Sequence, residues 1–223
     1  MKNRVTYFFL ILLCLVSSSC FELFEEVNLK EDGSGTYSFT ANFSQSKTKL
    51  KSIMLMDKIN GHTVPSETEI REEIKELEQL VKQTKGISEF TKKLDFDNFI
   101  FMFSCKFDKL EALNTAVKNV RIAKNLQDNT HDNQFGYDKE KNVFYRYFNP
   151  TFQEEYEDLN LEDKKIFQGA KVVSICKFEQ EVVSVSNSNA RVAANKKAIM
   201  MQLKAVDIIA NKSSIKNSVT LAQ

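Results

Sequence analysis

FELFEEVNLKEDGSGTYSFTANF, residues 21–43, carries the clearest structural signal in the chain. Its second half alternates, with ring or apolar side chains at every other position and Ser, Thr and Asn between them, which is typical of a half-buried strand. The first half alternates less cleanly, because Glu25 shares a face with Leu23, Val27 and Leu29. Between them, EDGSG at 31–35 favours a tight turn, since glycine adopts positive φ without steric cost. The stretch therefore predicts a β-hairpin.

Helical spacing follows this hairpin. The clearest helix begins at Ser66, where Ser66 and Glu69 form a capping-box pattern ahead of an apolar stripe on one face. Further helices are expected over about 44–59 and 108–126, with a second hairpin over 87–107. We therefore predict an α+β fold, with antiparallel β-sheets built from hairpins and three main helices packed on one face.

The second half of the sequence is rich in strands. Residues 127–136 are polar and predict a loop, which is also a possible boundary within the domain. Beyond it we expect strands or hairpins over 143–148, 170–186, 191–203 and 218–221, one or two short helices over 151–167, and a short helical turn over 207–210. Residues 20–223 are expected to form a single α+β domain.

Residues 1–20, MKNRVTYFFLILLCLVSSSC, have the order of a secretory signal: Lys2 and Arg4, a 12-residue apolar run over 5–16, and then small residues. The apolar run is shorter than the roughly 20 residues that a spanning helix needs. Cys20 directly after three serines resembles the lipobox of bacterial lipoproteins, although Ser17 stands where that box usually has Leu. We expect residues 1–19 to be a signal peptide and Cys20 to be lipidated; the alternatives are ordinary secretion or an uncleaved anchor.

Composition restricts the class of function. The sequence is 42% hydrophobic and 27% charged, as in a folded protein, and its net charge is +1. Without residues 1–19, which carry two basic and no acidic residues, the net charge is −1, so we do not expect a nucleic-acid partner. We find no phosphate loop and no metal-ligand or catalytic spacing, and predict no catalytic residue, no metal site and no cofactor. The acidic stretch 154–163 favours a solvated face over a Ca²⁺ site, because it lacks the DxDxDG order.

Two further cysteines lie in predicted strands. Cys105 belongs to the apolar strand 99–107, and Cys176 belongs to the strand-rich region 170–186. Export permits disulfides, so facing strands could bring Cys105 and Cys176 within bridging distance. The alternative, which the sequence favours equally, is two buried free thiols.

Large rings occur on both faces of the strand over Phe144–Phe148. This pattern favours a core strand, and the alternative is an exposed aromatic face for a hydrophobic ligand or partner.

The motif at Cys20, the hairpin over 27–37 and the late strands from Val182 to Leu221 resemble lipoproteins of the Bacteroidota. More loosely, the chain is similar to LppM-type lipoproteins, whose mature domain begins with a strand, an Asp-Gly-Ser-Gly-like turn and another strand. The resemblance implies an α+β domain in the cell envelope, attached to the membrane through lipid on Cys20. It transfers no catalytic residue.

We therefore expect a non-enzymatic lipoprotein that acts as a binding or assembly module, with an envelope protein as a possible partner. The alternative is a periplasmic carrier or sensor of a hydrophobic ligand. An apolar pocket would favour the carrier, and a flat apolar patch would favour the assembly module. Phe21 follows Cys20 where Asp would retain an enteric lipoprotein in the inner membrane, which favours the outer membrane.

Overall fold

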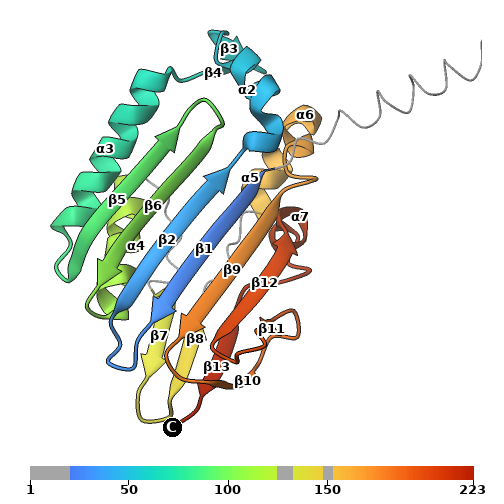
Figure 1. The fold of residues 1–223 in the computed structure, drawn as a ribbon. Coiled ribbons are helices and arrows are strands. Elements are labelled where there is room, and N and C mark those ends of the chain that lie inside the picture. The colour runs from blue at the N-terminus through green and yellow to red at the C-terminus, as the bar shows by residue number, and fades with distance from the viewer. Residues whose placement is uncertain (1–20, 125–132, 148–152) are drawn as a thin grey trace, which may run out of the picture.

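The computed structural model describes residues 21–124, 133–147 and 153–223. Its larger sheet has seven strands, shown in Figure 1. Their order across the sheet is β11 (Arg191–Val192), β12 (Ala198–Lys204), β9 (Lys171–Phe178), β1 (Glu22–Leu29), β2 (Gly35–Asn42), β6 (Ile100–Phe107) and β5 (Ile87–Asp95). A second sheet has the order β10 (Val182–Val185), β13 (Asn217–Leu221), β8 (Val143–Arg146) and β7 (Phe135–Asp138), and β3 (Lys58–Ile59) pairs with β4 (His62–Thr63).

The helices include two long ones, α3 (Glu67–Gln83) and α4 (Leu110–Ala123). The shorter ones are η1 (Ser44–Ser46), α2 (Lys47–Ile53), α5 (Gln153–Asp158), α6 (Leu161–Lys165) and α7 (Ala205–Ile209). The predicted α+β class is confirmed, since the described residues form antiparallel-rich sheets and three helices of seven residues or more. The predicted capping box is present, because Ser66 accepts from the backbone N–H of Glu69 and the Glu69 carboxylate accepts from that of Ser66.

The predicted first hairpin is confirmed and places β1 in the middle of the large sheet. Its register runs from Glu22 opposite Asn42 to Leu29 opposite Gly35. In the turn, Gly33 has φ +88°, which explains the glycine there. A Cβ on Gly35 would lie 2.0 Å from the carbonyl oxygen of Asn28, so the strands can approach this closely only at a glycine.

The other neighbour of β1 comes from far along the chain. β9 pairs with β1 in parallel, with Val27 opposite Cys176 and Leu29 opposite Phe178. All other pairings in the described residues are antiparallel. This one parallel pairing is not a hairpin and departs from the hairpin architecture expected from the sequence.

One face of the large sheet is covered by two different layers. Over β5 and β6 the cover is α3 and α4, whereas over β1, β9 and β12 it is the second sheet (Figure 1). The main core lies between these layers and contains side chains from both halves of the chain. Its buried members are Val27, Leu29, Cys105, Phe107, Leu110, Leu113, Phe135, Phe144, Cys176, Phe178, Val182, Ile199, Val219 and Leu221.

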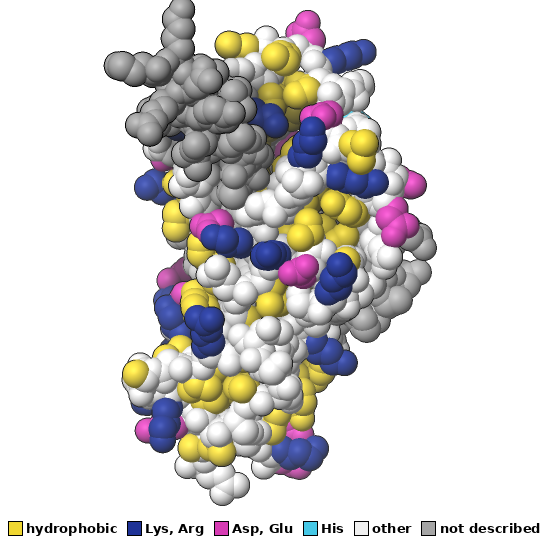
Figure 2. All heavy atoms as spheres, turned by 90° about the vertical axis from the view of Figure 1, so that its right-hand side faces the viewer, with side chains coloured by type: hydrophobic (Ala, Val, Ile, Leu, Met, Phe, Trp, Pro, Cys, Tyr) yellow, Lys and Arg dark blue, Asp and Glu magenta, His cyan; other side chains and the backbone are white. Residues whose placement is uncertain are grey.

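Helix α2 does not lie on the sheet with α3 and α4. It lies beyond the end of β2, next to the β3–β4 hairpin (Figure 1). The edge of the molecule at β12 is mixed in character, since Figure 2 shows hydrophobic side chains there in small groups separated by charged ones. None of the helices in the described ranges is both long and apolar enough to cross a membrane.

The region predicted as a loop, 127–136, contains the start of a strand. β7 begins at Phe135 and forms a hairpin with β8. Asn114 of α4 holds β7 in place, because its amide donates to the carbonyl of Phe135 at 2.8 Å and its oxygen accepts from the N–H groups of Gln134 and Phe135. Buried hydrogen bonds therefore join α4 to the end of the 127–136 segment, and the main core contains side chains from both sides of that segment.

Candidate ligand-binding site

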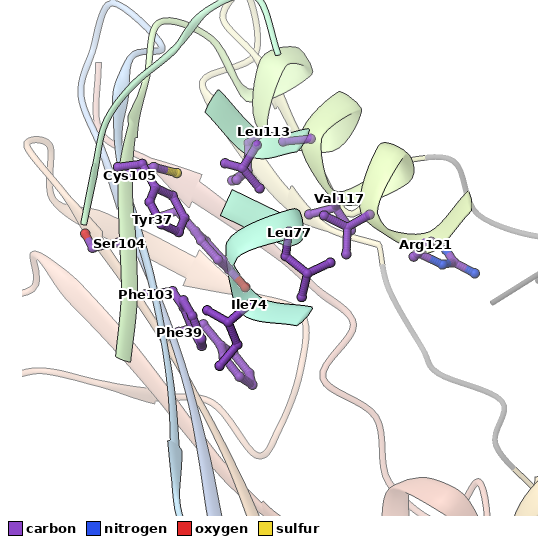
Figure 3. Close-up of a pocket in the computed structure, with 14 residues that line it drawn as sticks. Tyr37, Phe39, Ile74, Leu77, Phe103, Ser104, Cys105, Leu113, Val117 and Arg121 are labelled. Atoms are coloured by element: carbon purple, nitrogen blue, oxygen red, sulfur yellow. The ribbon is translucent and has the colours of Figure 1, made fainter. Parts of the chain in front are cut away.

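A cavity of about 330 Å³ lies between the large sheet and the two long helices. β2, β5 and β6 form one wall, and α3 and α4 form the other (Figure 3). The lining consists of Tyr37, Phe39, Ile74, Leu77, Val81, Phe90, Phe103, Ser104, Cys105, Leu113, Ala116, Val117, Val120 and Arg121.

The cavity exists because α3 covers the sheet incompletely. Ile74 is its only fully buried residue, while Leu77 and Val81 on the same stripe are half-buried. From Ile74 to Val81 the wall extends over seven residues, or about 10 Å at the helical rise. The apolar stripe that the sequence predicts as core packing is therefore largely a pocket wall.

The lining offers little polar chemistry. Among the described residues that line it, Arg121 is the one charged residue, and in Figure 3 its guanidinium points away from the sheet. Tyr37 contributes its ring from β2. Such a surface removes apolar groups from water and places few constraints on a ligand's polar atoms.

Next to the cavity, a buried ion pair connects the two sheets. The guanidinium of Arg146 in β8 binds the carboxylate of Glu25 in β1 through two contacts of 3.0 Å, Nε to Oε2 and Nη2 to Oε1. The two side chains are 3% and 14% exposed, respectively, which makes this a bidentate pair in a largely desolvated setting. Arg146 also donates to the carbonyl of Gln134 at 3.1 Å and lies over the ring of Phe135.

Tyr37 connects the cavity with the ion pair. Its ring lines the cavity, and its hydroxyl donates to Oε1 of Glu25 at 3.4 Å. Burial, followed by the negative charge of Glu25, raises the pKa of Tyr37 well above its ordinary value. Tyr37 therefore stays neutral and donates this hydrogen bond at all physiological pH values.

The sequence does not reveal this ion pair, although both signals are present. Glu25 is a single carboxylate on an otherwise apolar strand face, and Arg146 shares a face with Phe144. A charge on a buried face needs a partner. Which charge pairs with which follows only from the three-dimensional arrangement of β1 and β8.

The aromatic strand has the role of a core strand. Phe144 is fully buried and packs against Phe178 with ring centroids 5.4 Å apart. Tyr145 and Tyr147 stack on each other at 5.4 Å and are half-buried, and Phe148 lies outside the described residues. The apolar cavity forms elsewhere, between β6 and the helices.

The two strand cysteines lie far apart in the same row of the sheet. Cys105 is opposite Tyr37, Tyr37 is opposite Val27, and Val27 is opposite Cys176. Three strand spacings separate their Cα atoms by about 14 Å, twice the limit of about 7 Å for a disulfide. Both are buried free thiols in the structure, the second of the two alternatives. The predicted lipidation site, Cys20, lies outside the described residues, as does the signal peptide.

No arrangement of metal ligands occurs within the described parts of the chain. His62 is exposed on the β3–β4 hairpin, and its Nε2 lies 3.6 Å from the carboxylate of Asp163 in α6. Asp163 also accepts from the side-chain amide of Asn60 at 2.9 Å. These contacts hold the β3–β4 hairpin against α6.

Among solved structures, the fold is similar to the folded domain of LppM from Mycobacterium tuberculosis, determined by NMR. The TM-score is 0.45 at 11% sequence identity, and the match covers 89% of this chain and 87% of that one. No family model matches the sequence, and no curated protein matches it. The proposals below therefore rest on the residues of this chain.

Removing one member of the ion pair should destabilise the domain. We expect Arg146→Met to lower the free energy of unfolding by about 3–5 kcal/mol, because Glu25 is left charged and buried. The double variant Glu25→Leu with Arg146→Met should recover most of this loss. Glu26→Gln is the matched control: Glu26 pairs with Lys177 at 2.7 Å on the exposed side, and its loss should cost less than about 1 kcal/mol. Equal costs for Arg146→Met and Glu26→Gln in urea unfolding would contradict a structural role for the buried pair.

The buried thiols should be unreactive in the folded protein. Burial raises the pKa of Cys105 from 9.0 to about 11 and that of Cys176 from 9.0 to about 12. At pH 8 we expect both thiols to be alkylated slowly until urea unfolds the chain. In the unfolded chain without reductant, we expect the peptides of both cysteines to be alkylated. Because folding raises these pKa values, their contribution to stability is complete below pH 9 and decreases as the pH rises from 9 towards 11. Peptide mass spectrometry that finds a Cys105–Cys176 crosslink would contradict the assignment.

Proposed function

We propose that this protein is a membrane-anchored binding module of the cell envelope and that it holds an elongated hydrophobic ligand between its large sheet and helices α3 and α4. The observation that supports this proposal is the apolar cavity. Of the two roles considered from the sequence, a pocket favours the carrier or sensor over a module with a flat contact surface.

The physical reason lies in the apolar surface that lines the cavity. Transferring an apolar molecule from water onto such a surface is favourable in rough proportion to the apolar area removed from water. At about 330 Å³ the cavity lies within the range of known ligand pockets, roughly 300–1,000 Å³. An apolar molecule that fills it would regain contacts with Phe39, Leu77 and Phe103 and would leave water, so its binding should be favourable.

We propose binding as the function, with no chemical reaction. The lining can exclude water from a ligand and contact its apolar surface, and Arg121 lies at one side of the cavity. This combination suits an amphiphile with an alkyl or similar body. An envelope protein that delivers or receives such a ligand is the partner that this role would require.

The proposed attachment is lipid on Cys20, after removal of residues 1–19. The fold begins directly afterwards, because Phe21 is buried, with its ring centroid 5.4 Å from that of Phe43 and 5.9 Å from that of Phe167. A lipidated Cys20 would therefore hold the domain close to the bilayer without an intervening linker. Phe21 after Cys20 favours the outer membrane over the inner one.

Ligand binding can be tested with a fluorescent fatty-acid probe and two tryptophan variants of α4. We expect saturable binding to the wild type and a loss of affinity of about tenfold or more in Val117→Trp, because the indole occupies the pocket. Ile122→Trp is the matched control, since Ile122 is on the same helix and 62% exposed outside the pocket. Both variants should keep the wild-type circular dichroism spectrum. Equal probe affinity in both variants, or no probe binding to the wild type, would contradict the proposal.

A further inference from the structure

We propose that residues 47–58, which comprise α2 and the turn after it, dock on the bilayer and insert Leu55 and Met56 into its interface. We call this segment the α2 tip. The proposal rests on the proposed lipid anchor at Cys20 and is independent of the pocket. It assigns a membrane-contact surface to a segment whose residues Leu55 and Met56 are exposed to solvent.

The first observation is exposure. Leu55 is 90% exposed, the highest value for a large hydrophobic side chain in the described residues, and Met56 is 49% exposed. α2 has no buried residue. The turn is nevertheless ordered by backbone hydrogen bonds, because the N–H of Leu55 donates to the carbonyl of Ser52 at 3.3 Å and that of Met56 to Ile53 at 2.9 Å. The structure therefore holds two apolar side chains out into the solvent.

The second observation is charge. The α2 tip contains Lys47, Lys49, Lys51 and Lys58 and one acidic residue, Asp57, which gives a local charge of +3. The chain without its signal has a net charge of −1, so this positive charge is local. Lys47 donates to the side-chain oxygen of Asn98, and Lys51 lies 3.7 Å from the carboxylate of Asp97. Apolar side chains surrounded by lysines are typical of segments that lie in a membrane interface with anionic headgroups.

The third observation is position. Glu22 at the start of β1 pairs with Asn42 at the end of β2, and η1 and α2 follow directly. Phe21, one residue after Cys20, packs on Phe43, which immediately precedes η1. Figure 1 shows α2, β3 and β4 beyond the same end of the large sheet at which β1 begins.

This position favours the bilayer as the binding partner of the α2 tip. Consecutive Cα atoms are about 3.8 Å apart, so lipid on Cys20 would enter the membrane close to the base of α2. A domain held there must turn this end towards the headgroups. Leu161 of α6, which is 78% exposed, lies at this same end of the molecule, whereas Val183 of β10, which is 66% exposed, lies in the second sheet, towards the opposite end (Figure 1).

The sequence contains no tryptophan, so a single introduced indole reports on one position. We would compare Leu55→Trp with the control Val183→Trp in the purified full-length protein, added to vesicles of phosphatidylethanolamine and phosphatidylglycerol that carry brominated acyl chains. We expect the fluorescence of Leu55→Trp to be quenched about twofold or more beyond that of Val183→Trp and its emission to shift to the blue. Replacing Lys49 and Lys58 with Gln in the Leu55→Trp protein should weaken its contact with these vesicles by about fivefold for each lysine.

The mass of the N-terminal peptide, measured on the same samples, separates the anchor from the tip. If Leu55→Trp is quenched while Cys20 is unmodified, the result would contradict the proposed lipid anchor and support membrane contact by the α2 tip. The opposite result is an acylated Cys20 with Leu55→Trp and Val183→Trp quenched equally, or with neither quenched. That result would overturn the proposed membrane contact of the α2 tip and leave the proposed lipid anchor standing. Probe binding to the pocket is measured separately, so its failure would be recognised independently of both results.

Discussion

The ion pair between Glu25 and Arg146 constrains how the two sheets of this protein can meet. A carboxylate on the inner face of the middle strand must find a positive charge, since burying it alone would cost several kcal/mol. The guanidinium of Arg146 supplies this charge through two hydrogen bonds and thereby fixes the position of β8 relative to β1. The second sheet covers β1, β9 and β12, whereas α3 and α4 cover β5 and β6. The ion pair therefore lies where the second sheet meets β1, next to the part of the sheet that α3 and α4 cover.

Local patterns in the sequence predict the elements that depend on neighbouring residues. The hairpin over 21–43 follows from alternation and the glycines of its turn, and α3 follows from its cap at Ser66 and its apolar stripe. The parallel pairing of β1 with β9 could not be predicted, because it joins residues 149 positions apart, such as Glu22 and Lys171, and leaves no trace in local periodicity. β7 was hidden for a related reason: polar residues precede Phe135, and its place in the sheet depends on the buried Asn114 of α4.

The candidate site shows the same difference between what local sequence predicts and what depends on the three-dimensional arrangement. A sequence reveals that α3 has an apolar face, but not whether that face is filled. Here Ile74 is buried while Leu77 and Val81 are half-buried beside the cavity, so the stripe forms part of a cavity wall. The α2 tip has the opposite character, because Leu55 is 90% exposed and Met56 is 49% exposed. The apolar cavity and the exposed α2 tip are the two features on which our proposal of a binding module at a membrane surface rests.

The central claim, that the pocket holds a hydrophobic molecule, can be tested directly on protein isolated from the cell envelope. The purified protein would be extracted with organic solvent and the extract analysed by mass spectrometry, with the Val117→Trp protein processed in parallel. The account predicts an amphiphile with a long apolar chain, present at about one molecule per protein and depleted in the Val117→Trp sample. Extracts with the same amphiphile content from both proteins, or with none from the wild type, would contradict it.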